Sequence, residues 1–287
     1  MANAGTINAQ AASINTVSGI ISGAGVFNQN GTGRTIITGA NTYTGATTVN
    51  AGTLQIGDGT TVGTSIQASG TVAVNGTSTL AVLLPNAGAF NNNVNLNAAG
   101  TTFNTLVAAG TTNTIGGNIT GAAGTNILQS GAGTAVLTGN NATFAGTTTI
   151  AAGTLQLGLL GAGGALGAGP IVNNGILVLD GANQTYVNVI SGTGSLVKQQ
   201  AGTTTILSGN NTYSGVTTVA AGILTLGNVN ALGTTAGGTV VNDNATLNLN
   251  GLAIGAETVQ LGNAGVAGAT LTNNNVGTAA SLQGAVI

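Results

Sequence analysis

The amino-acid sequence predicts an all-β fold, a parallel β-solenoid, and three observations support this prediction. The chain repeats one block three times, its apolar residues alternate with a period of two, and only four Phe and three Tyr occur among 287 residues. Sandwiches and barrels fill their cores with aromatic and large aliphatic side chains, whereas a solenoid stacks small ones from coil to coil. The hydrophobic content of 42% favours ordered strands over a disordered, glycine-rich chain.

The repeated block occupies residues 39–57, 139–158 and 209–227. In each copy a Gly and an Asn precede an aromatic residue, and a second Gly, a Thr-Thr-Val or Thr-Thr-Ile run and an Ala-Gly pair follow it. We expect these recurring Gly and aromatic positions to have a structural role in the solenoid. They are Gly39, Tyr43, Gly45, Gly52, Gly139, Phe144, Gly146, Gly153, Gly209, Tyr213, Gly215 and Gly222.

Each block is preceded, about one coil earlier, by an Ile-Ser-Gly or Ile-Thr-Gly triplet. With these triplets the repeat signatures cover residues 21–57, 119–158 and 190–227. Looser coils fill the segments between them. The sequence therefore predicts a single continuous β-solenoid over residues 1–287 rather than separate domains.

Short alternating runs mark the expected strands in chain order, with Gly and Asn supplying the positive-φ corners between them. The clearest runs are 35–38, 47–49, 53–56, 70–74, 78–84, 93–96, 103–107, 176–179, 186–190, 195–197, 203–207, 239–241, 245–249 and 258–261. Pro85 ends one of them, because proline lacks the ladder donor. Coils of roughly 20–25 residues give about 12–14 coils, each adding ~4.8 Å, with Asn and Thr ladders expected at the corners.

A glycine-rich run at 158–170 is the one segment that resembles a phosphate-binding loop. It lacks the Lys-Ser or Lys-Thr pair that would follow such a loop, and no helix is expected after it. We interpret it as a flexible corner or a protruding loop.

Composition excludes most catalytic chemistry, because the chain has no His and no Cys. The six charged residues are Arg34, Lys198, Asp58, Asp180, Asp243 and Glu257. Asp243 with Glu257, or Asp180 with Lys198, could share a face, but polysaccharide-cleaving sites gather more acids than this. We therefore expect no enzyme, no cofactor and no metal site, with a carbohydrate-active β-helix as a remote alternative.

The charged residues have simpler expected roles in this reading. Asp58 and Asp180 each precede a Gly and are interpreted as turn residues. Arg34 and Lys198 are interpreted as solvated single charges. Two cations are too few for a nucleic-acid surface, and no apolar run is long enough to cross a membrane as a helix. The first residues lack the basic and apolar segments of a signal peptide.

The blocks at 33–57 and 202–227 resemble the passenger-associated transport repeat of bacterial autotransporters. The segment 192–198, just before the block at 202–227, extends the resemblance of that block. The resemblance implies a right-handed parallel β-helix that is secreted to the extracellular surface of a Gram-negative bacterium. Because residues 282–287 lack the amphipathic strands of a translocator barrel, we expect an excerpt of a passenger, a processed passenger or a related chain without a barrel.

The expected function is a non-enzymatic structural stalk or adhesin shaft at the cell surface. The alternative is a subunit of a self-assembling extracellular fibre or surface layer, stacked end to end through the unpaired strand edges of its end coils. The sequence leaves open a host or cell-surface receptor or glycan as a partner. Nucleic acid and direct membrane insertion are not expected.

Overall fold

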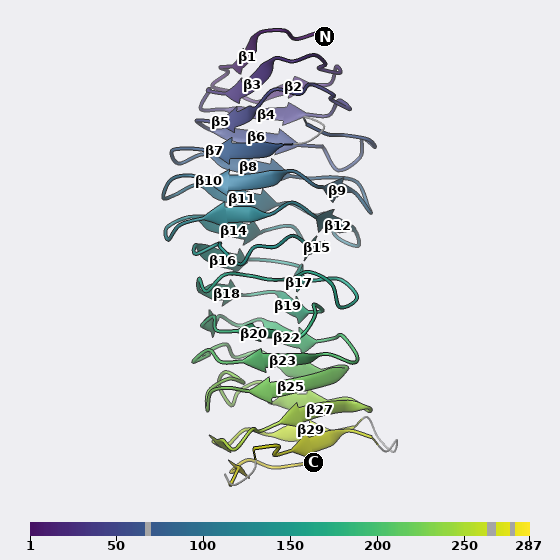
Figure 1. The fold of residues 1–287 in the computed structure, drawn as a ribbon, viewed down its shortest axis with the longest axis vertical. Helices are drawn as coiled ribbons and strands as arrows, with labels where there is room; N and C mark the ends of the chain where they lie inside the picture. Colours follow the sequence, from purple (N-terminus) through teal and green to yellow (C-terminus); the bar gives the residue numbers. More distant parts are fainter. Residues whose placement is uncertain (67–69, 263–267, 276–278) are drawn as a thin grey trace.

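The computed structural model describes residues 1–66, 70–262, 268–275 and 279–287. These residues form an all-β parallel solenoid of about 12 turns and contain no helix, which confirms the predicted fold class. Figure 1 shows the coils stacked along one axis, with the two ends of the chain at opposite ends of the stack.

Each full turn has three faces, which we number in chain order. The first face carries β1 (Thr6–Ala9), β3 (Val26–Gln29), β5 (Thr47–Val49), β7 (Thr71–Val74), β10 (Asn93–Leu96), β13 (Ile119–Gly121), β20 (Gln184–Tyr186), β23 (Thr204–Leu207), β25 (Gly222–Leu226), β27 (Ala245–Asn248) and β30 (Thr270–Thr272). The second carries β2 (Asn15–Val17), β4 (Arg34–Ile37), β6 (Thr53–Ile56), β8 (Thr79–Val82), β11 (Thr102–Thr105), β14 (Asn126–Gln129), β16 (Thr147–Ile150), β18 (Ile171–Asn173), β21 (Ile190–Ser191), β28 (Ala253–Ile254) and β31 (Ser281–Leu282). The third carries β9 (Ala89–Phe90), β12 (Thr112–Ile115), β15 (Thr134–Leu137), β17 (Thr154–Leu157), β19 (Ile176–Leu179), β22 (Ser195–Lys198), β24 (Thr217–Val219), β26 (Thr239–Val241) and β29 (Val259–Leu261).

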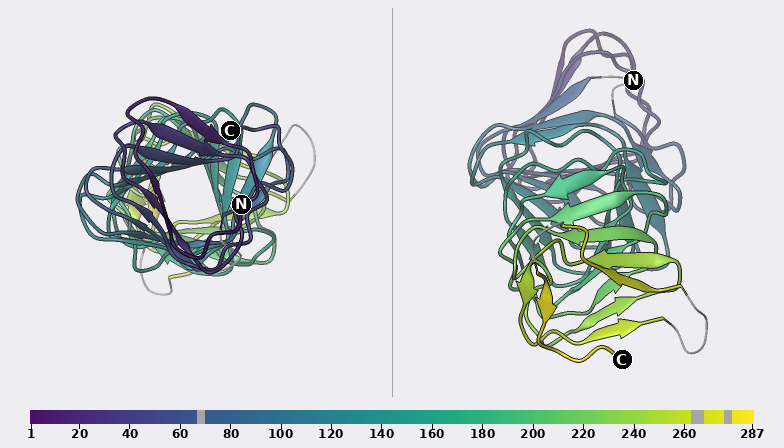
Figure 2. Two further views of the ribbon diagram at one scale, coloured as in Figure 1. Left: turned by 90° about the horizontal axis from the view of Figure 1, so that it is seen from above. Right: turned by 60° about the horizontal axis from the view of Figure 1, so that its bottom comes forward.

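The order in which the chain visits the sheets shows which strands share a face. The run β10, β11, β12 passes through the first, second and third faces, and β13 returns to the first. Farther along, β19 on the third face is followed by β20 and then by β21 on the second. β20 and its sheet therefore occupy the first face, although they do not pair with β13. Viewed from above, the coils overlie one another around the axis (Figure 2).

The core is built by stacking equivalent inward positions of successive strands. On the second face, Leu54 pairs with Leu80, Leu80 with Phe103, and Phe103 with Ile127, and none of these side chains is exposed. Each fully buried aliphatic side chain of this kind stabilises the fold by roughly 1.5–3 kcal/mol. Because stacking places like upon like, a narrow core needs few large aromatic residues.

A ladder of exposed and half-buried asparagines begins in β1 and continues along the corner between the first and second faces, as expected from the sequence. Its members are Asn8, Asn30, Asn50, Asn75 and Asn97, and we call it the asparagine ladder. Each Nδ2 donates to the Oδ1 of the preceding member, at 3.1, 2.7, 2.8 and 2.9 Å in chain order. All four bonds point the same way along the axis, so that each polarises the next.

The glycine-rich run at 158–170 contains a tight turn at the corner between the third and first faces. Leu159 and Ala162 exchange two backbone hydrogen bonds, at 2.9 and 3.0 Å. Leu160 has φ +50° and is 80% exposed, and its N–H donates to the Asp180 carboxylate at 3.0 Å. A leucine in this left-handed conformation is strained, because its Cβ crowds the following carbonyl.

Candidate functional site

Each repeat contains a buried asparagine whose side chain accepts a backbone N–H from the preceding coil, and in two repeats it also donates to the following coil. In the first repeat, Asn41 is 2% exposed, and its Oδ1 accepts the backbone N–H of Ile21, one coil earlier, at 2.7 Å. Its Nδ2 donates to Ser65 O, one coil later, at 2.8 Å and to Gly39 O at 3.0 Å. The side chain thereby ties the preceding and following coils to its own.

The other two repeats have an asparagine at the same position. Asn141 accepts the Ile119 N–H at 2.7 Å, and Asn211 accepts the Ile190 N–H at 2.8 Å. Asn211 also donates to Ala231 O, in the following coil, at 2.7 Å. We call Asn41, Asn141 and Asn211 the asparagine clamps.

The clamps explain why an Ile-Ser-Gly or Ile-Thr-Gly triplet precedes each block. The Ile of the triplet is buried, and its N–H turns toward the clamp instead of toward a strand carbonyl. A buried N–H needs a partner, and asparagine supplies both an acceptor and a donor from one short side chain. Our sequence analysis did not select these residues, although the Gly-X-Asn spacing shared by the three blocks is a visible signal.

The first Gly of each block lies where the backbone of an adjacent coil comes very close. A Cβ added to Gly39, Gly139 or Gly209 would lie 2.6, 2.2 or 1.9 Å from a backbone oxygen one coil earlier. No side chain fits at these distances, so glycine is required for the close approach.

The other two recurring glycines are equally restricted. A Cβ on Gly45, Gly146 or Gly215 would lie 2.2–2.3 Å from a carbonyl of the preceding coil. The glycines of the Ala-Gly pairs have positive φ, +58° at Gly52, +63° at Gly153 and +73° at Gly222. Gly52, Gly153 and Gly222 each contact a loop of the preceding coil, where an added Cβ would lie 2.3–2.4 Å from a carbonyl oxygen.

The aromatic residue of each block is buried beside its clamp. Tyr43 and Tyr213 are 0% exposed, and Phe144 is 1% exposed. The Tyr213 hydroxyl lies 2.6 Å from Thr217 Oγ1. The Tyr43 hydroxyl lies at the same distance, 2.6 Å, from Thr47 Oγ1. Phe144 lacks the hydroxyl, and Thr148 stands at the equivalent position.

The three clamps lie on three different faces. The first lies between β4 and β5, in place of a strand on the third face, and the second lies between β15 and β16, on the first face. The third lies between β23 and β24, on the second face. Successive repeats are thus rotated by one face about the axis.

A polar side chain is buried at a second equivalent position of each repeat. Gln29 and Gln129 donate to the loop that follows them, at 2.8 Å to Gly31 O and 2.7 Å to Gly131 O. The third repeat has Lys198 at this position, 0% exposed, so our interpretation of Lys198 as a solvated charge is wrong. Its Nζ donates to Gln200 O, to Thr203 Oγ1 at 3.0 Å and to Ala221 O at 3.3 Å.

The environment of Lys198 explains how a cation is accommodated there. Three acceptors match the three N–H bonds of the ammonium group, which stabilises a buried Lys that has no directly paired carboxylate. Burial lowers the pKa of Lys198, and the charge of Asp180 opposes that shift. Asp180 lies one coil earlier, and its carboxylate accepts Gln156 Nε2 at 2.9 Å.

The remaining acids are dispersed rather than gathered into a site. Glu257 is 3% exposed, accepts Thr239 Oγ1 at 2.8 Å, and has its pKa raised by burial. Asp58 is exposed, and hydrogen bonds from the Thr61 and Thr60 backbone hold its pKa far below its ordinary value. No cluster of three or more acids that could hold a metal ion occurs among the described residues.

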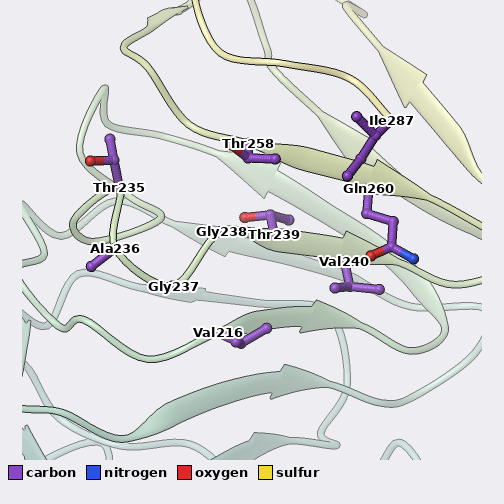
Figure 3. A pocket seen from close by; sticks show the side chains of 10 residues that line it. All are labelled: Val216, Thr235, Ala236, Gly237, Gly238, Thr239, Val240, Thr258, Gln260 and Ile287. Carbon is purple, nitrogen blue, oxygen red and sulfur yellow. The ribbon is translucent and has the colours of Figure 1, made fainter.

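A shallow hollow lies on the third face, near the C-terminal end (Figure 3). The residues that line it include Gly237, Gly238, Val216, Val240 and Ile287. It contains no charged residue, and its polar groups are Thr hydroxyls and the Gln260 amide. It lacks the convergent polar groups that fix a small ligand in place.

Comparison with known proteins finds a described repeat at the three segments that contain the clamps. Residues 27–56, 127–157 and 196–226 match the passenger-associated transport repeat. The chain carries three passenger-associated transport repeats. Each match spans four strands and one clamp: β3–β6, β14–β17 and β22–β25.

A relative supports the same assignment. The adhesin BmaC autotransporter of Brucella suis biovar 1 (strain 1330) is 36% identical to this chain over 189 residues. That alignment covers 61% of this chain and 5% of the relative, so the chain spans a small part of the length of the relative. No solved structure matches the chain significantly.

Together the repeats and the relative indicate an autotransporter passenger domain. Secretion to the surface of a Gram-negative bacterium follows from that class. Neither match is to an enzyme. The described residues contain no helix long and apolar enough to cross a bilayer.

Proposed function

We propose that this chain is a non-enzymatic, rigid shaft of an autotransporter passenger, with residues 1–287 forming one continuous solenoid. The observation that carries the proposal is the placement of one clamp on each face. Coils of a solenoid contact only their neighbours, so bending or sliding opens one side of the stack first. Clamps on all three faces oppose opening in every direction.

The distribution of side chains favours a role as a shaft rather than as a recognition surface. All four Phe and all three Tyr are buried, which leaves no aromatic ring available to stack on a sugar. Lys198, Asp180 and Glu257 are buried as well, so half of the six charged residues are withheld from the surface. The polar side chains on the surface of the solenoid are therefore mainly hydroxyls and amides rather than charged groups.

A second candidate follows from the printed name of the relative, which is an adhesin. In this alternative the shaft itself binds a host surface, through hydroxyl and amide rows instead of aromatic or charged side chains. In a third reading, copies of the same rod stack end to end into a fibre. These three readings differ in what the purified chain does by itself.

Negative-stain electron microscopy of the purified chain across a concentration series separates the first reading from the fibre. A shaft gives discrete straight rods of roughly 60 Å, since about 12 turns at ~4.8 Å stack along the axis. Filaments that lengthen with concentration would favour the fibre. Saturable binding of the chain to host cells, absent with a size-matched control protein, would favour the adhesive reading.

A further inference from the structure

Four asparagines precede a glycine in this chain, at 30–31, 75–76, 174–175 and 250–251. Such pairs deamidate spontaneously, because glycine leaves room for its own backbone nitrogen to reach the asparagine Cγ. The nitrogen must be free to lose its proton and to move toward the side chain. The hydrogen bonding of each glycine N–H therefore distinguishes the four pairs.

Three of these glycines have an engaged N–H. Gly31 donates to Ala9 O at 2.9 Å, Gly175 to Asn173 Oδ1 at 3.2 Å, and Gly251 to Asn273 Oδ1 at 2.6 Å. Gly76 differs, since its N–H has no hydrogen bond to any part of the chain that the structure describes. It is exposed, has φ +61°, and lies in a turn that the Ser78 N–H closes on Asn75 O at 3.3 Å.

The asparagine of this fourth pair is also a member of the asparagine ladder. Asn75 Nδ2 donates to Asn50 Oδ1 at 2.8 Å, and Asn75 Oδ1 accepts Asn97 Nδ2 at 2.9 Å. Two neighbours thus hold the amide plane from both sides. Attack on Cγ requires that plane to turn toward the Gly76 nitrogen, which breaks at least one of these bonds.

We propose that Asn75 is the deamidation site of this chain and that the asparagine ladder sets its rate. The Gly76 nitrogen loses its proton and forms a bond to Cγ of Asn75, the Cγ–Nδ2 bond breaks, and ammonia leaves. Water then opens the cyclic imide at either carbonyl, giving aspartate or isoaspartate at position 75. No oxidant, reductant or enzyme is needed.

The product changes the ladder at one defined rung. A carboxylate cannot donate to Asn50 Oδ1, so two oxygens face one another where a 2.8 Å hydrogen bond stood. The bond from Asn97 is kept, because the new group still accepts. Isoaspartate also lengthens the backbone by one carbon and shifts the start of the following turn. The modification therefore weakens stacking at one corner of the coils that carry β5 and β7.

Peptide mapping by mass spectrometry, after incubation of the folded chain at mildly alkaline pH, tests the proposal. We expect position 75 to convert several-fold faster than positions 30, 174 and 250. Equal conversion at all four sites, or faster conversion at another, would overturn the assignment of the site.

A pair of variants tests the role of the ladder. Asn97→Ala removes the hydrogen bond to Asn75 Oδ1 and is expected to accelerate conversion at position 75 several-fold. Asn95→Ala is the matched control, because Asn95 lies on β10, two residues before Asn97, is exposed, and accepts a hydrogen bond from Thr120 instead of joining the ladder. The same rate in both variants would show that the ladder does not control the reaction.

Discussion

A buried oxygen without a partner provides the sharpest stability prediction. Gln29 Oε1 is buried and makes no hydrogen bond in the described structure. In the second repeat the equivalent Gln129 Oε1 accepts a hydrogen bond from the hydroxyl of Thr105, which pairs with Gln129 one coil earlier. The residue that pairs with Gln29 one coil earlier is Ala9, which has no hydroxyl to donate.

Ala9→Thr should therefore supply the missing donor. An unsatisfied buried acceptor costs about 1–3 kcal/mol, and a hydrogen bond adds a net 0.5–1.5 kcal/mol, so a gain of roughly 1 kcal/mol in unfolding free energy is expected. Ala9→Val is the matched control, because it has the shape of threonine and the same β-branching without the hydroxyl. The side chain of Ala9 already packs against the core, which places a hydroxyl there next to Gln29.

The assay is urea unfolding of the two variants, together with amide hydrogen exchange at Asn30, whose N–H donates to Ala9 O at 2.8 Å. Exchange at Asn30 reports the stability of the first coils separately from that of the whole chain. This distinction is needed because solenoids do not always unfold in one step. Equal stability of the Thr and Val variants would refute the reasoning. The reciprocal change, Thr105→Val, should lower the stability of the second repeat by a similar ~1 kcal/mol.

Three further outcomes are expected. Leu160→Gly should raise the unfolding free energy by about 1 kcal/mol, because it removes the strain of a leucine at φ +50°; a loss in urea unfolding would contradict this. Tyr213→Phe should lower it by about 1 kcal/mol through loss of the 2.6 Å contact with Thr217, and an unchanged unfolding midpoint would show that the hydroxyl contributes nothing. Burial raises the pKa of Glu257, so its contribution is fully present below the ordinary value of about 4.5 and is lost as pH rises through the raised pKa. Stability measured from acidic to neutral pH should therefore fall less in Glu257→Gln than in the parent, and parallel curves would exclude this role for Glu257.

The fold was predictable because its signals are local. Alternation with a period of two and glycine or asparagine at corners place the strands at 47–49 and 53–56, where β5 and β6 are found. The expected strand at 78–84 is shorter in the structure, Thr79–Val82, and it ends before Pro85 as expected. The solenoid class could be predicted from the repeated local pattern alone, because equivalent coils stack on one another and no contact between distant segments has to be known first.

The clamps were not predicted, because their meaning depends on neighbouring coils. Asn141 looks like one more turn residue in an Asn-rich chain until the buried N–H of Ile119 is placed beside it. Lys198 was missed for a similar reason: its three acceptors converge only after the coil has closed. The sequence spacing of the repeats does not reveal their rotation about the axis. Because the loops differ in length, the number of faces that the chain passes between 27–56 and 127–157 cannot be counted from the sequence.

The most direct test of the clamps is amide hydrogen exchange at Ile21, Ile119 and Ile190 in the parent chain and in variants that each lose one clamp asparagine. Asn211→Ala should accelerate exchange at Ile190 by roughly ten- to a hundredfold, equivalent to the ~1.4–3 kcal/mol cost of an unmade buried hydrogen bond, and leave Ile21 and Ile119 protected. Asn210→Ala, at the exposed neighbouring position, should leave all three amides unchanged. If Ile190 exchanges at the same slow rate in both variants, the clamp does not connect the coils, and the proposed rigidity of the shaft has another cause.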